Sequence, residues 1–152
     1  MQSKGEREMQ WLKYFMTLAK NVSEMSKDPS HKIGAVIVDQ NKRIVSTGFN
    51  GFAKNIVDSD ERLNDKDIKR KLTLHAEENA VSFAKRDLTG CDIYVYGYPP
   101  CTHCTSLLIQ SGIKCIYYYN PTHKVSEHWK DDFKLAETIA TEVNIPYLEL
   151  DI

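Results

Sequence analysis

The chain has 152 residues, of which 41% are hydrophobic and 27% are charged. This length and composition suit one domain with a packed core and exclude a largely disordered chain. Lys and Arg number 20 and Asp and Glu number 21, giving a net charge of −1. The balance argues against a protein that grips long nucleic acid, because that grip depends on a basic excess.

The chain carries no apolar segment of the length that a membrane span requires, so we expect no membrane contact. Residues 1–10 are polar and lack the apolar core of a secretory signal, which predicts a cytoplasmic protein (the host cytoplasm if the source is viral). In such a reducing compartment, the close pair Cys101 and Cys104 indicates a metal site or a redox pair rather than a structural disulfide.

The first part of the chain predicts a helix and a hairpin. Apolar residues at helical spacing predict a helix over about residues 6–25. Two apolar runs, Ile33 to Val38 and Ile44 to Phe49, predict strands joined by a turn at Asp39 to Lys42. The polar stretch 50–74 follows, and a loop this long in a small domain usually serves a function.

The remaining pattern alternates between helix-like and strand-like segments. The expected elements are a short helix at 65–72, a helix from near Leu74 to before Gly90, a strand at 93–96, a helix around Cys104 stopped by Gly112, a strand at 113–119, a helix at 129–143 and a strand at 147–150. This order, without internal repeats or linkers, predicts one α/β domain over residues 1–152, with a mixed sheet covered by helices on both faces.

Two cysteines open the third long helix, in the run Pro100-Cys101-Thr102-His103-Cys104. Positions i and i+3 lie close together on one helical turn, so both sulfurs can aim at one point. The partial positive charge of a helix N-terminus favours thiolates, and Pro100 suits a first turn because its missing N–H is no loss there. The segment is therefore suited to hold a metal dication.

A second motif, His75-Ala76-Glu77, opens the preceding helix. His75 and Glu77 are two positions apart, a spacing that in mid-helix separates side chains by about 200° of rotation. In a first turn, however, both side chains can lean toward the same cleft. His75 is then a third ligand, and Glu77 stays unligated beside it. Three protein ligands leave one tetrahedral position open, as in catalytic zinc sites, where a nearby carboxylate can transfer protons.

Together the motifs form H-x-E followed by P-C-x-x-C, the signature of zinc-dependent nucleobase deaminases. Other readings of the same residues stay open. The cysteines fit a redox pair or a structural zinc with His103 as fourth ligand, while Cys91 and Cys115 fit a buried core.

The chain resembles the deoxycytidylate deaminases over roughly residues 8–120, well beyond these motifs. Five segments carry the resemblance: Ile33 to Val38, Ser46 to Gly51 with its G-[YF]-N-G turn, Glu61 to Asp65, Lys71 to Glu77, and Leu107 to Lys114. The resemblance implies a three-layer α/β/α cytidine-deaminase-like fold with a five-stranded mixed sheet.

The resemblance also implies an activity and its site. One zinc ion would be held by His75, Cys101 and Cys104, and Glu77 would be the acid/base in hydrolysis of dCMP to dUMP and ammonia for thymidylate synthesis. The substrate-binding residues it implies are Asn50, Ala76, Ser26 and Tyr118. The open alternatives are a turn-forming Asn50, a helix-ending Ser26 and a packing role for Tyr118.

Members of this family are commonly hexamers, activated by dCTP and inhibited by dTTP, with Mg²⁺ accompanying the triphosphate. This chain departs from them at Phe52-Ala53-Lys54-Asn55, where regulated members read x-P-x-G, which leaves regulation as an open alternative. Residues 52–74 contain no His or Cys, so we expect no second zinc. Arg62 or Lys66 is a candidate to meet a nucleotide phosphate at an oligomer contact.

Three rival functions share parts of this pattern. A tRNA or polynucleotide deaminase uses the same zinc site, but the net charge and the run Thr105-Ser106-Leu107-Leu108 argue against it. A nucleoside, free-base or guanine deaminase would act without a phosphate. A non-catalytic module with the same fold is disfavoured because Glu77 and the three ligands are all intact.

Overall fold

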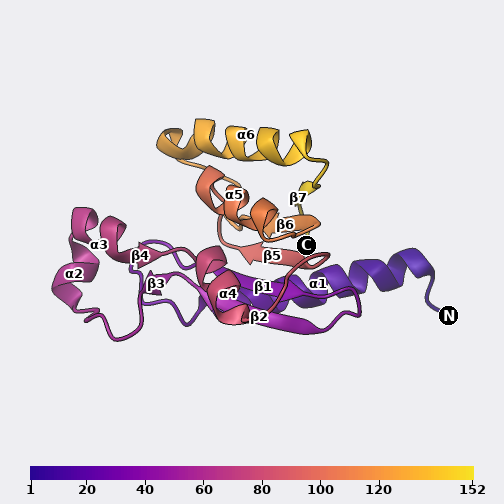
Figure 1. Cartoon of the computed structure of the whole chain (residues 1–152), viewed down its shortest axis with the longest axis horizontal. Helices are drawn as coiled ribbons and strands as arrows, with labels where there is room; N and C mark the ends of the chain where they lie inside the picture. Colours follow the sequence, from indigo (N-terminus) through magenta and orange to yellow (C-terminus); the bar gives the residue numbers. More distant parts are fainter.

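Five apolar runs form the central sheet. In the computed structural model, which describes residues 1–152, the strands lie in the order β2-β1-β5-β6-β7 (Figure 1). Their bounds are β1 (Gly34–Val38), β2 (Ile44–Phe49), β5 (Asp92–Tyr96), β6 (Cys115–Tyr119) and β7 (Tyr147–Glu149). Strand β1 is antiparallel to both β2 and β5, whereas β5, β6 and β7 run parallel. The predicted mixed sheet is therefore confirmed.

The expected hairpin turn joins β1 to β2. The Asp39 carboxylate accepts the backbone N–H groups of Asn41 at 2.8 Å and Arg43 at 3.0 Å. Lys42 adopts a left-handed conformation with φ of 63°. Asp is favoured in such turns because its short side chain bonds the backbone two residues on, which explains why sequence alone located this hairpin.

Helix α1 (Lys4–Ser23) covers one face of the sheet. Its buried residues Phe15 and Met16 pack with Val36 of β1 and Tyr94 of β5. All five residues of β1 are buried, because helices lie on both sides of that strand. None of the helices combines the length and the apolar character that a membrane span requires.

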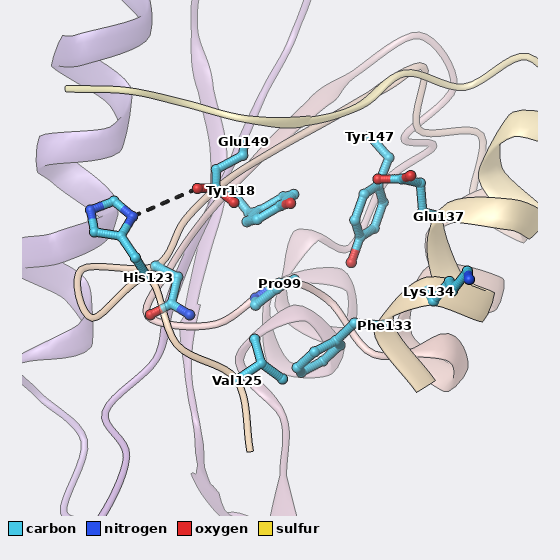
Figure 2. A pocket seen from close by; sticks show the side chains of 10 residues that line it. Pro99, Tyr118, His123, Val125, Phe133, Lys134, Glu137, Tyr147 and Glu149 are labelled. Carbon is cyan, nitrogen blue, oxygen red and sulfur yellow. Dashed lines mark ion pairs between the residues drawn. The ribbon is translucent and has the colours of Figure 1, made fainter. Parts of the chain in front are cut away.

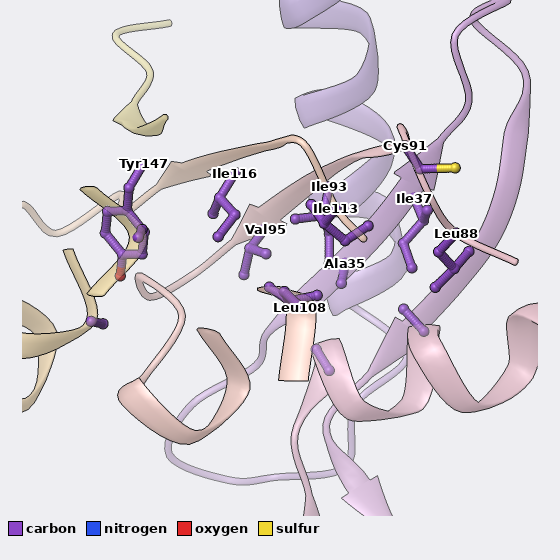
Figure 3. Packing of buried hydrophobic residues seen from close by; sticks show 14 residues of the cluster. Ala35, Ile37, Leu88, Cys91, Ile93, Val95, Leu108, Ile113, Ile116 and Tyr147 are labelled. Carbon is purple, nitrogen blue, oxygen red and sulfur yellow. The ribbon is translucent and has the colours of Figure 1, made fainter. Parts of the chain in front are cut away.

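Three helices occupy the other face: α4 (Ala76–Ala84), α5 (Thr102–Gln110) and α6 (Glu127–Glu142). Helix α4 packs on β2 and β1, α5 contributes Leu108 to the core against the sheet, and α6 lies over α5 (Figure 1). The larger core between them extends from Cys91 at one end to Tyr147 at the other (Figure 3). The three-layer α/β/α arrangement agrees with the expectation from the sequence.

The polar stretch 50–74 contains more regular structure than we expected. The short helix predicted at 65–72 is α3 (Lys66–Leu72), but α2 (Asp60–Asn64) precedes it. A two-stranded ribbon of β3 (Gly51–Phe52) and β4 (Thr73–Leu74) closes the stretch. Such a ribbon pairs residues far apart in the sequence, so no local periodicity announces it.

Gly48 of β2 sets how closely α4 approaches the sheet. A Cβ atom added at Gly48 would overlap backbone atoms of Ala76 and Ala80 in α4. The Oγ of Ser46 also donates to the carbonyl oxygen of Ala80 at 2.7 Å. Helix α4 therefore sits directly on β2, and its first turn, which carries the His-x-Glu motif, is held against the sheet.

We predict that Gly48→Ala lowers the free energy of unfolding by about 1–3 kcal/mol, because the added methyl group must displace backbone rather than a flexible side chain. Urea denaturation measures the effect. Gly5→Ala is the matched control, since a Cβ at this exposed helical position meets no atom within 4 Å. The control is expected to be neutral or stabilising by roughly 0.5–1 kcal/mol. Equal stabilities for the two variants would contradict the close approach.

Candidate metal centre and active site

The N-termini of α4 and α5 meet at one place. His75 is the residue before α4, with an extended backbone at φ −72° and ψ 158°, and Cys101 holds the same position before α5, at φ −71° and ψ 172°. From the sequence we expected His75 within the first helical turn, but its extended backbone puts it just outside the helix. This backbone change lets His75 and Glu77 face one cleft without opposing each other across the helix.

Three donor atoms converge where these helices begin. The Nδ1 atom of His75 lies 3.6 Å from Sγ of Cys101 and 3.3 Å from Sγ of Cys104, and all three ligand atoms lie within 4.8 Å of one another. In a tetrahedral zinc site, Zn–S and Zn–N bond lengths of about 2.3 and 2.05 Å separate N from S by about 3.6 Å. The donor set and its spacing therefore fit a zinc ion.

The protonation of these groups points the same way. The pKa of the Cys101 thiol falls to about 4, because its sulfur accepts hydrogen bonds from Cys104 and His75. The neighbouring thiolate and burial raise the pKa of Cys104, while contact with Cys101 raises that of His75 to about 9. Two buried thiolates side by side repel each other, so the double deprotonation that a zinc ligand pair needs requires a cation between them.

Glu77 lies in the first turn of α4 and is 4% exposed. Burial raises the pKa of its carboxyl to about 7, although His75 partly offsets this effect. A carboxyl group with a pKa near neutrality can both accept and release a proton at physiological pH. The adjacent Glu78 has another role, because its carboxylate accepts the backbone N–H of His75 at 2.8 Å and so stabilises the start of the helix.

His75, Glu77 and Cys101 line a cavity of about 380 Å³. Its other lining residues fall into three groups. Tyr98, Trp129 and Phe133 form an aromatic wall, and Ile33, Ala76 and Pro99 are apolar residues outside it. The polar and charged residues, which we call the rim, are Asp28, Ser30, His31, Asn50, Lys66, Lys69, Arg70 and Thr73. Trp129 and Phe133 are stacked at 5.8 Å, and Tyr98 continues the wall 6.0 Å from Phe133. The cavity thus joins an apolar side to a charged rim.

One cation of this rim is already neutralised. The Nζ atom of Lys69 lies 3.0 Å from the Asp28 carboxylate, and both side chains are largely buried. Burial by itself raises the pKa of Asp28, but hydrogen bonds from the His31 and Ser30 N–H groups and from Lys69 outweigh it and leave the pKa below its ordinary value. Lys66 and Arg70 are exposed, four residues apart on α3, and have no ion-pair partner.

The cavity contains two of the four residues expected to bind substrate, Asn50 and Ala76. The Asn50 amide is already engaged: it donates to the His31 carbonyl at 2.8 Å and accepts from the Ile33 N–H at 2.9 Å. Asn50 therefore braces the 31–33 segment that forms part of the rim. Ser26 is 3% exposed and does not line the cavity, since its Oγ donates to the Asn50 carbonyl at 2.9 Å.

Tyr118, the fourth residue expected to bind substrate, lines a separate cavity of about 260 Å³ behind the 97–101 segment.

The His103 side chain is 82% exposed and lies 3.9 Å from the Glu78 carboxylate, so it does not complete a four-ligand site. Cys91 and Cys115 are buried and unpaired, as expected for core residues. Only His75, Cys101 and Cys104 form a group of donors that could hold a metal ion.

The aromatic wall and the position of Arg70 at the cavity were not predicted from the sequence. Trp129 and Phe133 were assigned to the apolar face of a core helix, which they share with Ala136 and Ala140. The alanines do pack into the core, whereas the two aromatic side chains stay half-buried and reach the cavity. The change from large to small residues along one helix face was the available signal.

Comparison with known families matches residues 9–120 to the cytidine and deoxycytidylate deaminase zinc-binding region. The chain is 42% identical over 144 residues to an uncharacterised deaminase encoded in the luxG 3' region of Aliivibrio fischeri, covering 93% of this chain and 96% of the relative. It is also 36% identical over 127 residues to the deoxycytidylate deaminase of Mus musculus, covering 78% of this chain and 70% of the relative.

Solved structures share the fold. The dCMP deaminase of cyanophage S-TIM5 in its apo form aligns with a TM-score of 0.70 at 21% identity, over 93% of this chain and 98% of the phage chain. The same phage enzyme in complex with dCMP and dUMP aligns with a TM-score of 0.67 at 19% identity, over 99% of this chain and 100% of the other.

Proposed function

The chain belongs to the cytidine and deoxycytidylate deaminase family, and on this premise we propose that it hydrolyses dCMP to dUMP and ammonia. The observation that carries the proposal is the buried carboxyl of Glu77, which lines the same cavity as the His75 and Cys101 metal donors. Deoxycytidylate deaminases from mouse and human, 36% and 35% identical to this chain, support the choice of substrate.

We assign His75, Cys101 and Cys104 as the ligands of one zinc ion per chain. Zinc bound by three protein ligands supplies a Lewis acid that activates water near neutral pH. The positive ends of α4 and α5 both point at this place, which favours the thiolate forms of the two cysteines. The Cys104 N–H also donates to the Cys101 sulfur at 3.4 Å and orients it.

Glu77 transfers the protons of the reaction. Its carboxylate takes a proton from the attacking water and delivers it to the ring nitrogen of cytosine, and then assists departure of the amino group as ammonia. The pKa of about 7 supports both directions of transfer. Because Glu77 sits in the first turn of a helix seated on the sheet, its position is defined by the packing of α4 on β2.

The remainder of the cavity matches the other parts of a nucleotide. We propose that Ala76 contacts the base edge and that Asn50 holds the sugar side of the pocket through the 31–33 segment it braces. Tyr98, Trp129 and Phe133 provide an apolar wall for the base and sugar. Lys66 and Arg70, the unpaired cations of the rim, are suited to bind the phosphate.

Control by nucleoside triphosphates is a separate part of the proposal. By its resemblance to regulated family members, we propose a hexamer that is activated by dCTP with Mg²⁺ and inhibited by dTTP. The segment Phe52 to Asn55, where this chain departs from the regulated family members, lines a further cavity of about 340 Å³ that Asn50 also lines. Inhibition by dTTP and the mass of the particle in solution test this part independently of the chemistry.

The first test is a steady-state assay of the zinc-loaded protein with dCMP, CMP, deoxycytidine and dCTP as parallel substrates. We expect a clear preference for dCMP, because the cations of the rim favour binding of a phosphate and the volume of the cavity limits the size of the substrate. Equal rates with deoxycytidine would favour a nucleoside deaminase. Absence of turnover with all four, combined with activity on a cytosine-containing oligonucleotide, would replace the proposal by a polynucleotide deaminase.

Substitution of Glu77 separates chemistry from metal binding. We predict that Glu77→Ala lowers kcat by about 10²–10⁴-fold or more, while zinc stays at one ion per chain. The other buried carboxyl that lines the cavity, Asp28, is paired with Lys69 and cannot replace Glu77. Rates and metal analysis on the same sample measure the two quantities. The exposed helix residue Glu8 provides the control Glu8→Ala, and residual turnover within tenfold of wild type would reject the assigned role.

The phosphate assignment predicts a substrate-dependent loss. Lys66→Ala and Arg70→Ala should each reduce kcat/KM for dCMP about tenfold, the scale of one charge-assisted hydrogen bond, and leave kcat/KM for deoxycytidine unchanged. Lys71→Ala is the matched control, because Lys71 pairs with Asp67 and does not line the cavity. Equal losses with both substrates would indicate damage to the fold of α3 instead of a lost phosphate contact.

A further inference from the structure

The turn that carries the two cysteines is held from behind by the C-terminal part of the chain. The hydroxyl of Tyr147, in β7, donates to the carbonyl oxygen of Pro100 at 2.6 Å. Pro100 directly precedes Cys101, and Thr105 donates to the same carbonyl at 3.4 Å. Tyr147 is only 8% exposed, and its ring closes one end of the main core (Figure 3). Strand β7 is therefore linked to the turn that carries the two cysteines by one buried hydrogen bond.

A second contact comes from α6. The Asp132 carboxylate accepts the backbone N–H of Thr102 at 2.9 Å, and the Thr102 hydroxyl donates to the Asp132 carbonyl at 2.8 Å. The first N–H groups of a helix have no partner within the helix and are usually capped by the preceding side chain. Here that side chain is Cys101, whose sulfur accepts from the Cys104 N–H and belongs to the metal site. Asp132 caps the N–H that Cys101 leaves free.

The residue before this turn, Pro99, borders open space on the same side. A cavity of about 260 Å³ lies there, lined by Pro99, Phe133, Glu137 and Tyr147 among others (Figure 2). Tyr147 projects its hydroxyl toward the 97–101 segment across the edge of this space (Figure 2). Pro99 borders this cavity, and in the turn that follows, the hydrogen bonds of Tyr147 and Asp132 provide a directional restraint on the backbone.

We propose that Tyr147 and Asp132 are positioning residues of the metal centre, which fix the Pro100 to Cys104 turn so that both sulfurs meet His75 Nδ1. The inference rests on the zinc site proposed above. No hydrogen bond joins either residue to the three ligand side chains, and each bonds the backbone of the turn instead. Partners that orient ligands in this way typically contribute 10–100-fold to metal affinity.

Zinc affinity, measured by competition with a chromogenic chelator, tests the proposal in the full-length protein. We expect Tyr147→Phe, which removes only the hydroxyl, and Asp132→Ala each to weaken zinc binding about tenfold or more. Asp132→Asn keeps an oxygen that can accept from the Thr102 N–H, so it should restore most of the affinity that Asp132→Ala loses. Tyr117→Phe is the control, because Tyr117 packs on the α1 side of the sheet and should bind zinc as wild type does.

Thermal denaturation of the metal-free and zinc-loaded forms separates positioning from general stability. A positioning role predicts that the stabilisation by zinc, measured as the Tm difference between the two forms, shrinks in Tyr147→Phe and Asp132→Ala. Parallel loss of Tm in both forms with unchanged zinc affinity would overturn the proposal, as would equal affinity in Asp132→Asn and Asp132→Ala. Failure of the wild-type protein to bind zinc would instead reject the zinc site itself.

Discussion

The central constraint on this molecule is the convergence of two thiolates and one imidazole at a single buried point. Like charges so close together are unfavourable in a protein interior, so the surrounding structure must hold them near each other and near a compensating positive charge. Two helix N-termini supply part of that positive charge, because their unpaired N–H groups and dipoles favour negative charge, and the proposed zinc ion supplies the rest. The strands, turns and capping contacts together hold the N-termini of α4 and α5 next to each other.

Each helix reaches the metal centre by a different route. Helix α4 lies directly on β2, where Gly48 allows backbone to approach backbone, so its first turn has little freedom. Helix α5 follows the loop after β5, and this loop borders a cavity on one side. The second helix therefore depends on hydrogen bonds from β7 and α6, elements that are formed by the last part of the chain.

The cavity is lined by one cation that is paired with a carboxylate and by two cations that are not. The largely buried Asp28–Lys69 pair ties α3 to the segment before β1 and shapes the rim, which leaves Lys69 with no free charge to offer a ligand. Lys66 and Arg70 on the same helix keep theirs. The same cavity is lined by these two exposed cations, three aromatic side chains and the buried carboxyl of Glu77, a combination that supports the proposed binding of a small anionic nucleotide by a protein whose net charge is −1.

The candidate site and most of the architecture were predictable from local patterns in the chain. His75, Glu77, Cys101 and Cys104 were recognisable because their spacing is local and because each motif opens a helix. The main-sheet strands and their flanking helices were predictable because burial imposes a period on the residues within each element. Which distant residues surround the candidate site became visible only in the folded chain. Ser26 and Tyr118 lie away from the cavity, Trp129 and Arg70 lie along it, and Tyr147 meets Pro100 across 47 positions. These relations depend on how elements pack against one another, and no short-range pattern in the chain records the direction in which a side chain leaves its element.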